Sequence, residues 1–331
     1  MIHSHSYPRA ALAGNPSDGY FGKTLAYTFN NFKAEVCLKP AASESAMPAN
    51  LKIFDCPGTD KMLNADMTHW AEGIRLIPGA IRCFAEYCRE HGIQPDTEPY
   101  TLGFRSDIPS QVGLASSSAI VHACYQALMS HHGVDIAAPF LANEILRAEV
   151  EILKIQGGLQ DRVTQVYRGM VFMDFKQALM RRRRYGHYET IEPPPGLRLY
   201  VAYRPELAEF SGILHGQLRD RWNRNDRDLK QAMERCAGFA ARARQQLMQG
   251  DFSALARTIN AGFDQRHAVI PSSPGNLEMI QLARSVGASA NQAGSGGAIT
   301  GTCADENMFD DLKRLLTSRG IEVIQPEVTR P

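Results

Sequence analysis

A strand-to-helix turn built from small residues constrains this 331-residue chain more than any other stretch. It runs from Pro109 to Ala119 and reads Pro-Ser-Gln-Val-Gly-Leu-Ala-Ser-Ser-Ser-Ala, between an expected strand at 100–104 and an apolar helical segment at 120–129. The first amide groups of a helix have no partner within the helix, and the helix dipole favours negative charge there. Gly113 lets the backbone approach a ligand closely. The turn is therefore either an ordinary serine-capped helix start or an anion-binding site.

The charge balance argues against binding to nucleic acid or to a membrane. The chain has 36 Lys and Arg residues against 35 Asp and Glu residues, a net charge of +1, so no overall field attracts a polyanion.

The length of the chain favours two domains. We expect them at 1–188 and 189–331, because the basic run at 181–184, which we expect to be a solvated loop, and the proline-rich segment at 192–196 mark a boundary. The expected ligand is a small molecule.

The seven cysteines are scattered without a CxxC pair, which argues against structural zinc and against a disulfide framework. The first residues lack the apolar core of a signal peptide, and no apolar run approaches membrane-spanning length. We therefore expect reduced thiols in a cytoplasmic protein that is a monomer or a homodimer.

The periodicity of the apolar residues predicts strands and helices without strict βαβ alternation, which is typical of the α+β class. Strands at 24–29 and 32–38 are expected to pair as an antiparallel hairpin around Asn30 and Asn31. Further strands are expected at 51–54, 100–104, 197–203, 298–303 and 321–324, and further helices end near Gly92, Gly133, Gly250, Gly287 and Ser318.

Glu149 falls on the apolar face of an expected helix that follows Gly133. Asp135 is expected to cap this helix. Leu141, Ile145 and Ile152 share one face of that helix, and Glu149 lies on the same face. A buried carboxylate is costly unless a metal, a cation or hydrogen bonds hold it. Glu149 is therefore either a functional residue or a glutamate at the solvent edge of the stripe.

The segment Gly22-Lys23-Thr24 resembles the end of a P-loop, GxxxxGK[ST]. Ser17 stands where the first glycine should be, and the residues after Thr24 predict a strand where the P-loop needs a helix. The P-loop interpretation therefore fails. A nucleophile elbow, GxSxG, is also absent around Ser116.

A second glycine cluster, Gly294-Ser295-Gly296-Gly297, precedes the expected strand at 298–303. Alone it is equally typical of a tight turn. Together with the serine-rich turn and with Glu149 and Asp161, however, it could cradle a triphosphate, hold magnesium and activate a hydroxyl group. We expect Gly113 and Gly296 to converge on one nucleotide from separate lobes.

These motifs make the chain resemble the GHMP kinases over nearly its whole length. Residues 109–119 match the family's second motif, PxxxGLxSSxA, while 9–18 and 294–297 are similar to its first and third motifs. The twelve-residue spacing from Glu149 to Asp161 is similar to that between the magnesium-binding glutamate and the catalytic aspartate of galactokinase-like members. Within the family, the phrases at 14–24, 158–163 and 252–256 resemble the glucuronokinase subfamily. In the first motif, Asn-Pro-Ser-Asp replaces the Glu-His-Thr-Asp of the sugar kinases.

The resemblance implies a two-domain fold, with an N-terminal lobe like ribosomal protein S5 domain 2 and a ferredoxin-like C-terminal lobe. It implies an ATP-dependent, Mg²⁺-dependent kinase that phosphorylates the anomeric hydroxyl of a sugar acid, D-glucuronate. Asp161 would be the base and Arg9 would offset charge. The residues implied to bind magnesium are Ser117 (or Ser116) and Glu149. Those implied to bind the substrate are Asn15, Ser17, Asp18, Lys23 and Arg162. Those implied to bind the nucleotide are Pro109, Gly113, Leu114, Ala115, Ser116, Ser117, Ser118, Gly294, Ser295, Gly296 and Gly297.

A uronate needs a cation for its carboxylate. Lys23 is the first candidate, with Arg162 and Arg266 behind it, while the alternative for Lys23 is an ordinary surface lysine. Three alternative functions stay open at this point. They are a kinase for another small alcohol, such as a heptose, galactose or mevalonate-type substrate, a non-catalytic sugar- or nucleotide-binding protein, and a nucleic-acid binder that uses the arginines at 181–184.

Overall fold

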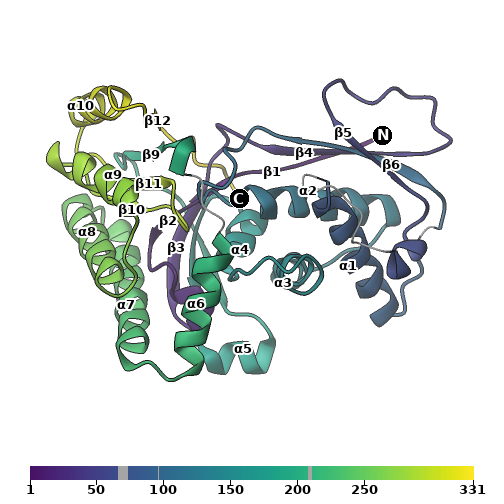
Figure 1. Ribbon diagram of the computed structural model, residues 1–331, viewed down its shortest axis with the longest axis horizontal. Helices are drawn as coiled ribbons and strands as arrows, with labels where there is room; N and C mark the ends of the chain where they lie inside the picture. Colours follow the sequence, from purple (N-terminus) through teal and green to yellow (C-terminus); the bar gives the residue numbers. More distant parts are fainter. Residues whose placement is uncertain (66–73, 96, 208–210) are drawn as a thin grey trace. The chain divides into compact units, whose positions relative to one another are not determined.

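The computed structural model describes residues 1–65, 74–95, 97–207 and 211–331, and these form two compact units of non-contiguous segments (Figure 1). Unit 1 comprises 1–8, 32–108 and 116–166, and unit 2 comprises 9–31, 109–115 and 167–331. The sequence-based boundary between 188 and 189 falls within strand β8 (His187–Ile191). The assignment of the family's two domains to 1–188 and 189–331 stays a prediction.

Unit 1 contains a four-stranded antiparallel sheet with helices on one face. In the register of the sheet, Val36 is paired with Phe104 and Leu38 with Leu102, and all four side chains are buried. Helix α2 covers this face, and α1 packs beside it (Figure 1). The strand order is β1 (Ile2–Ser6), β4 (Ala34–Pro40), β6 (Tyr100–Ser106) and β5 (Lys52–Cys56), and the helices are α1 (Leu76–Glu90) and α2 (Ser116–His132).

The chain then passes through a helix that changes its winding. Helix α3 (Ala138–Arg147) continues directly into a π-helical turn, η3 (Ala148–Ile152), in which the Leu153 amide donates to the Ala148 carbonyl. Single π-turns inside helices occur frequently at functional sites. Helix α4 (Gln160–Tyr167) follows after a short irregular segment. A 3₁₀ turn, η2 (Asp60–Asn64), precedes α1.

Unit 2 contains two further four-stranded sheets. The hydroxyl groups of Tyr27 and Thr300 join the two sheets by a 2.6 Å hydrogen bond. The strand order of the first sheet is β2 (Arg9–Ala13), β3 (Lys23–Thr28), β7 (Met170–Asp174) and β8. The strand order of the second sheet is β10 (Asn291–Gln292), β11 (Ala298–Thr302), β9 (Leu199–Tyr203) and β12 (Glu322–Ile324).

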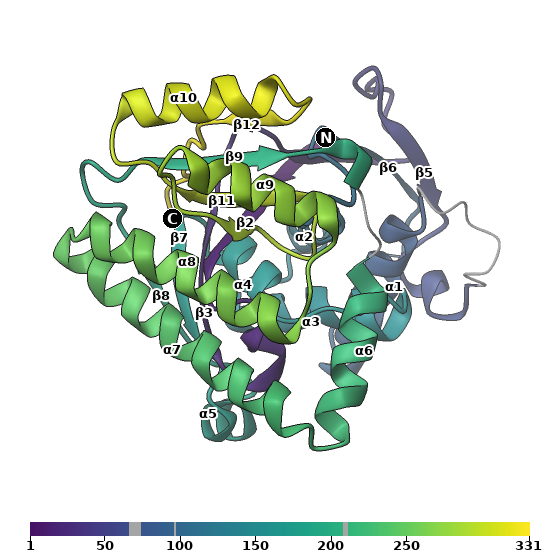
Figure 2. The same cartoon turned by 60° about the vertical axis from the view of Figure 1, so that its left-hand side comes forward.

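Long helices cover the sheets of unit 2. Helices α7 (Arg227–Gln249) and α8 (Phe252–Val269) lie side by side, and α7 packs against β3 (Figure 2). Helices α9 (Pro274–Ser285) and α10 (Glu306–Thr317) pack beside the second sheet, on a core that includes Tyr200, Ile280 and Leu312. The remaining elements are the turns η1 (Ser17–Tyr20) and η4 (Pro205–Leu207) and the helices α5 (Gln177–Arg183) and α6 (Ser211–Asn223).

Three local predictions are wrong. β3 and β4 do not form a hairpin, because β3 pairs with β2 and β7 whereas β4 pairs with β1 and β6. Asp135 does not cap α3, which begins at Ala138 after Ala137 in the cap position. The arginines at 181–184 end helix α5, which has no buried residue, instead of lying in a loop. The α+β class is confirmed.

The seven cysteines are free and buried, as expected. Across the described ranges, no helix combines the length and the apolar character needed to cross a bilayer.

Candidate active site

The two glycine loops meet inside unit 2. A Cβ atom placed on Gly113 would lie 3.0 Å from the carbonyl oxygen of Gly296 and 3.0 Å from the amide nitrogen of Ser295. A Cβ atom on Gly294 would overlap the carbonyl of Gly113. Gly113 and Gly297 also have positive φ angles, 78° and 81°, which favour glycine. Gly113 and Gly296 thus lie close together, as expected, and both belong to one of the two compact units. Their convergence on a nucleotide stays a prediction.

Arg9, at the start of β2, ties the two loops together. Its amide donates to the carbonyl of Leu114 over 3.1 Å. Its Nη1 donates to the carbonyl of Gly113 at 3.3 Å and to that of Ala293. Only 3% of Arg9 is exposed. The guanidinium therefore fixes the spacing of the two glycine loops. The sequence alone did not indicate this positioning role.

A residue that sequence reasoning missed, Asn276, supports the same loops. Its Oδ1 accepts from the amide of Gly297 at 2.7 Å, and its Nδ2 donates to Oγ of Ser273 at 2.7 Å. Asn276 lies in the first turn of α9 and is buried. The Ser-Pro-Gly-Asn sequence signals a helix start. It carries no signal for a contact twenty-one residues further along the chain.

In unit 1, the fully buried carboxylate of Glu149 accepts hydrogen bonds from serines in the first turn of α2. The Oγ of Ser117 donates to Oε1 of Glu149 at 2.8 Å, and the Oγ of Ser118 donates to Oε2 at 3.0 Å. Glu149 is 0% exposed, so the solvent-edge alternative is wrong. Ser116, also in the first turn, instead lies 3.4 Å from the hydroxyl of Ser106.

Arg162 compensates the charge of Glu149. Its Nε donates to Oε2 at 2.7 Å, its Nη2 forms an ion pair with the same oxygen, and its Nη1 donates to the carbonyl of Gly158 at 2.8 Å. A Cβ atom on Gly157 would lie 2.8 Å from Nη1, so a larger residue there would displace the guanidinium. Because Arg162 engages Oε2, Oε1 is the oxygen of Glu149 that faces the serine hydroxyl of Ser117.

Asp161 lies beside this pair in the first turn of α4. Its Oδ2 is 3.6 Å from Nη1 of Arg162, and 23% of its side chain is exposed. Helix N-termini stabilise a negative charge. Asp161 is thus a carboxylate at a helix N-terminus with access to solvent, whereas Glu149, twelve residues earlier, has no such access.

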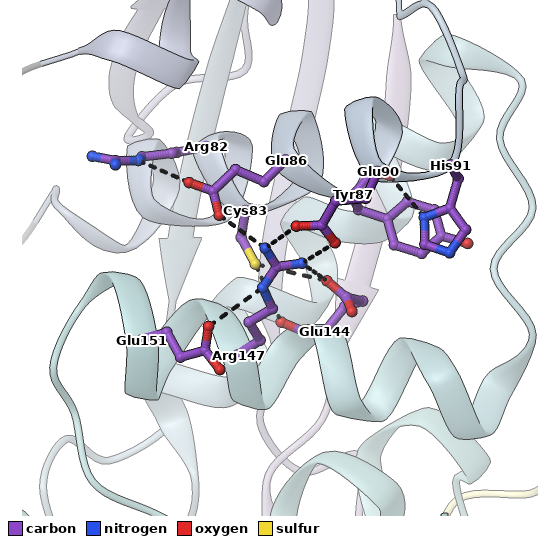
Figure 3. Close-up of polar contacts among 9 residues, drawn as sticks. All are labelled: Arg82, Cys83, Glu86, Tyr87, Glu90, His91, Glu144, Arg147 and Glu151. Atoms are coloured by element: carbon purple, nitrogen blue, oxygen red, sulfur yellow. Dashed lines mark hydrogen bonds and ion pairs between the residues drawn. The ribbon is translucent and has the colours of Figure 1, made fainter. Parts of the chain in front are cut away.

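A second arginine fixes the start of the π-turn that carries Glu149. Arg147 donates from Nη2 to Glu86 at 3.0 Å and to Glu90 at 2.7 Å, and it donates from Nη1 to Glu144 at 3.3 Å (Figure 3). Figure 3 also shows its Nε, which forms an ion pair with Glu151 at 3.5 Å. Burial raises the pKa of Glu144, while the hydrogen bond from Arg147 lowers that of Glu90. Arg147 therefore holds α1 against the junction of α3 and η3.

The predicted sugar-binding residues of the first motif are largely engaged in unit 2. The Oγ of Ser17, which is fully buried, donates to the carbonyl of Lys23 at 2.9 Å and accepts from its amide at 3.1 Å. Asn15 is 6% exposed and donates to the carbonyl of Gln292 at 3.1 Å. Asp18 lies in η1 and is partly exposed. The Lys23 ammonium forms an ion pair with Asp174, so its charge already has a partner.

The donor set in unit 1 fits magnesium better than a transition metal. Among the described residues, no group of three or more His, Cys, Asp or Glu side chains could hold a metal ion. Mg²⁺ typically takes one or two carboxylates, keeps several waters and binds substrate phosphates. The hydroxyl of Ser117 and Oε1 of Glu149, 2.8 Å apart, are two hard oxygen donors of that kind.

Comparison with known proteins identifies the family. The chain is 36% identical to "Probable glucuronokinase 2" of Arabidopsis thaliana over 317 residues, which cover 92% of this chain and 85% of the relative. It is 34% identical to "Glucuronokinase 1" of the same plant, with the same coverage. The chain belongs to the glucuronokinase family of GHMP kinases. As a sugar kinase, it is a phosphotransferase with an alcohol group as acceptor, and ATP is its phosphoryl donor.

The match to the GHMP kinases N terminal domain spans residues 76–169 of this sugar kinase. That range contains the serine-rich turn, Glu149, Asp161 and Arg162. The crystal structure of Streptococcus pneumoniae phosphomevalonate kinase in complex with phosphomevalonate and AMPPNP is similar over 99% of this chain and 100% of that one. Its TM-score is 0.77 and its sequence identity 15%. This likeness confirms the GHMP kinase fold that the sequence motifs predicted.

Proposed function

We propose that this GHMP kinase transfers the γ-phosphoryl group of ATP to the anomeric hydroxyl of D-glucuronate and releases 1-phospho-D-glucuronate and ADP. The names of the two plant relatives, which align with 92% of the chain, support this substrate. The observation that carries the kinase chemistry is the meeting of the two glycine loops, where a Cβ atom on Gly113 would lie 3.0 Å from the Gly296 carbonyl.

In this proposal, the phosphates of ATP bind the amides of the serine-rich turn. Gly113 and Ala115 carry little or no side chain within the turn at 109–115, and α2 begins at Ser116 directly after it. Its first amides and its dipole favour phosphate. The second loop, from Gly294 to Gly297, comes within contact distance of Gly113. We assign nucleotide binding to Pro109, Gly113, Leu114, Ala115, Ser116, Ser117, Ser118, Gly294, Ser295, Gly296 and Gly297.

Ser117 and Glu149 are the residues that we expect to hold Mg²⁺. When bound, this ion would neutralise charge on the phosphate oxygens. Arg162 keeps Oε2 of Glu149 engaged and so leaves Oε1 directed toward Ser117. Ser118 donates to the same carboxylate and limits its rotation.

Asp161 is our candidate for the base that accepts the proton of the attacking hydroxyl. An anomeric hydroxyl is more acidic than an ordinary alcohol, which makes a carboxylate a suitable acceptor. Phosphoryl transfer depends mainly on positioning and on the neutralisation of spreading charge. We assign the charge-offsetting role to Arg9, whose contacts with the carbonyls of Gly113 and Ala293 also support a positioning role.

Asn15, Ser17, Asp18, Lys23 and Arg162 are our candidates for sugar binding. Their contacts make Ser17, Lys23 and Arg162 less suitable for binding the sugar than Asn15 and Asp18. Ser17 closes the turn at 17–23, and Lys23 and Arg162 already face Asp174 and Glu149. A carboxylate of the sugar would have to compete with these acidic partners. The hydroxyl groups of the sugar are therefore a better match for Asn15 and Asp18.

ADP release with a panel of acceptors tests the proposal. At fixed ATP and Mg²⁺, the panel contains D-glucuronate, D-galacturonate, D-glucose, galactose, a heptose and mevalonate. We expect turnover with glucuronate to exceed that with each neutral sugar, and phosphate to appear at C1. Faster turnover of another alcohol would replace the proposed substrate, and no ADP release with any of them would contradict it. A cytoplasmic location and a monomeric or homodimeric state complete the proposal.

A further inference from the structure

Arg266, on helix α8, is a buried cation whose described hydrogen-bond partners are all neutral. Only 3% of it is exposed. Its Nη1 donates to Oε1 of Gln292 and, at 3.3 Å, to Oγ of Ser272. Its Nε donates no hydrogen bond within the described ranges. Burial lowers the pKa of Arg266 to about 10, so the guanidinium is still charged at neutral pH.

Three other arginines, by contrast, each have an acidic partner. Arg162 is paired with Glu149, Arg244 with Glu189 and Arg284 with Asp264. No such carboxylate faces Arg266 among the residues that the structure describes. Taking an ion out of water without a counter-charge is costly. A bound anion would supply the missing charge.

The position of Arg266 connects it with the first motif. Gln292, which accepts from Arg266 through its side chain, also accepts through its backbone carbonyl from Nδ2 of Asn15 at 3.1 Å. The preceding residue, Asn291, donates from Nδ2 to Oδ1 of Asn15 at 2.8 Å. Two hydrogen bonds therefore separate Arg266 from Asn15, and Gln292 and Asn291 hold Asn15 in place. All of these residues belong to unit 2.

We propose that Arg266 binds the carboxylate of the sugar acid and thereby selects uronates over neutral sugars. This inference rests on the proposed function, which places the sugar at the first motif. Guanidinium groups suit carboxylates because their donors match the two oxygens. Arg266 is better suited than Lys23 or Arg162, because those two cations already face the carboxylates of Asp174 and Glu149.

The test compares Arg266→Met and Arg266→Lys with the wild-type enzyme, and Arg257→Met serves as the matched control. Arg257 is an exposed arginine on the same helix that donates to Ser253. The measurements are KM and kcat for D-glucuronate, for D-glucose and for ATP. For Arg266→Met we expect a rise of about 10- to 100-fold in KM for glucuronate, from the loss of a charge-assisted pair. KM for glucose and for ATP should change by less than about threefold, and Arg266→Lys should fall between.

Binding without turnover gives a second measurement. Thermal unfolding is followed with and without D-glucuronate, in the absence of ATP. Wild type and Arg257→Met should be stabilised by the sugar acid, whereas Arg266→Met should not. The unliganded Arg266→Met variant should unfold at the same or a higher temperature than wild type, because an uncompensated buried charge has been removed.

The outcomes separate the inference from the proposed function. Equal increases of KM for glucuronate and glucose, or an increase for ATP alone, would overturn the role of Arg266, and the second result would assign it to a phosphate. Unchanged kinetics and an unchanged thermal shift in Arg266→Met would overturn it as well. If wild type releases no ADP with glucuronate but still shows an Arg266-dependent thermal shift, the proposed reaction fails and the carboxylate site stands.

Discussion

Arg162 donates from Nε to Oε2 of Glu149 over 2.7 Å, and neither side chain has more than 4% of its surface exposed. The pair links the π-turn at 148–152 to the first turn of α4. It also leaves the other carboxylate oxygen to Ser117. One ion pair thus sets both the charge and the orientation of the carboxylate that we assign to the metal.

Removal of Arg162 should destabilise the protein strongly. Arg162→Met leaves the Glu149 carboxylate buried without a cation, and breaking such a pair typically costs about 3–5 kcal/mol. The double variant Arg162→Met with Glu149→Gln removes both charges and should recover a large part of that loss. Urea unfolding of the two single variants, the double variant and wild type measures the coupling. Additive losses would contradict the ion pair as the source of the effect.

Asp161→Asn should reduce turnover by about 10²- to 10⁴-fold, because an amide cannot accept the proton of the attacking hydroxyl. The affinity for ATP should change little. Steady-state ADP release gives kcat, and fluorescence titration with a non-hydrolysable nucleotide gives the affinity. The partly exposed position of Asp161 makes a folding defect small. Wild-type turnover in this variant would remove Asp161 from the mechanism.

Gly294→Ala should separate the glycine loops. The added methyl group would overlap the carbonyl of Gly113, and forcing a group into a packed site costs about 1–3 kcal/mol. We expect KM for ATP to rise about tenfold, the effect of about 1.4 kcal/mol. Gly238→Ala on α7, where the nearest neighbour would be 4.0 Å from the methyl group, is the control and should retain wild-type kinetics. The loops are not the nucleotide site if both variants bind ATP equally well.

Arg147→Met should lower stability by about 2 kcal/mol, the scale of hydrogen bonds to charged groups, because Glu86, Glu90 and Glu144 lose their shared cation (Figure 3). Arg147 lowers the pKa of Glu90 below its ordinary 4.5. This stabilisation is therefore fully present above pH 4.5 and is lost as the pH falls through the lower, folded-state value. The difference between wild type and variant should shrink below that pH. Urea unfolding at pH 7, 5 and 4 checks this, and a constant difference would exclude Glu90 from the effect.

The sequence predicted most helices and the glycine-loop convergence because both depend on local signals. Gly250 ends α7, as the sequence indicated, and the carboxylate of Asp251 accepts from the Ala254 amide at the start of α8. The small residues of the turn at 109–115 and of the loop at 294–297 signalled close backbone approach, and the structure brings Gly113 and Gly296 together. Apolar periodicity and turn chemistry were sufficient for these features.

Strand pairing and the partners of charged residues could not be predicted in the same way. β3 and β4 are separated by a short turn, yet β3 pairs with β7 and β4 with β6, both of which lie far along the chain. The burial of Glu149 depends on Arg162, and that of Arg9 on the carbonyls of Gly113 and Ala293. Such pairings follow from tertiary packing, for which neither hydrophobic periodicity nor motif spacing carries a signal.

The non-contiguous composition of the two units imposes an order on biosynthesis. β2 and β3 leave the ribosome early, but β7, which completes their sheet, follows only at residue 170, and α7, which covers β3, at residue 227. Until then Leu12, Leu25 and Tyr27, all buried in the finished protein, have no core to enter. A nascent chain arrested near residue 166 would contain every segment of unit 1 and, in addition, the apolar strands β2 and β3 without their sheet partners. We expect such a chain to expose apolar surface and to bind a chaperone.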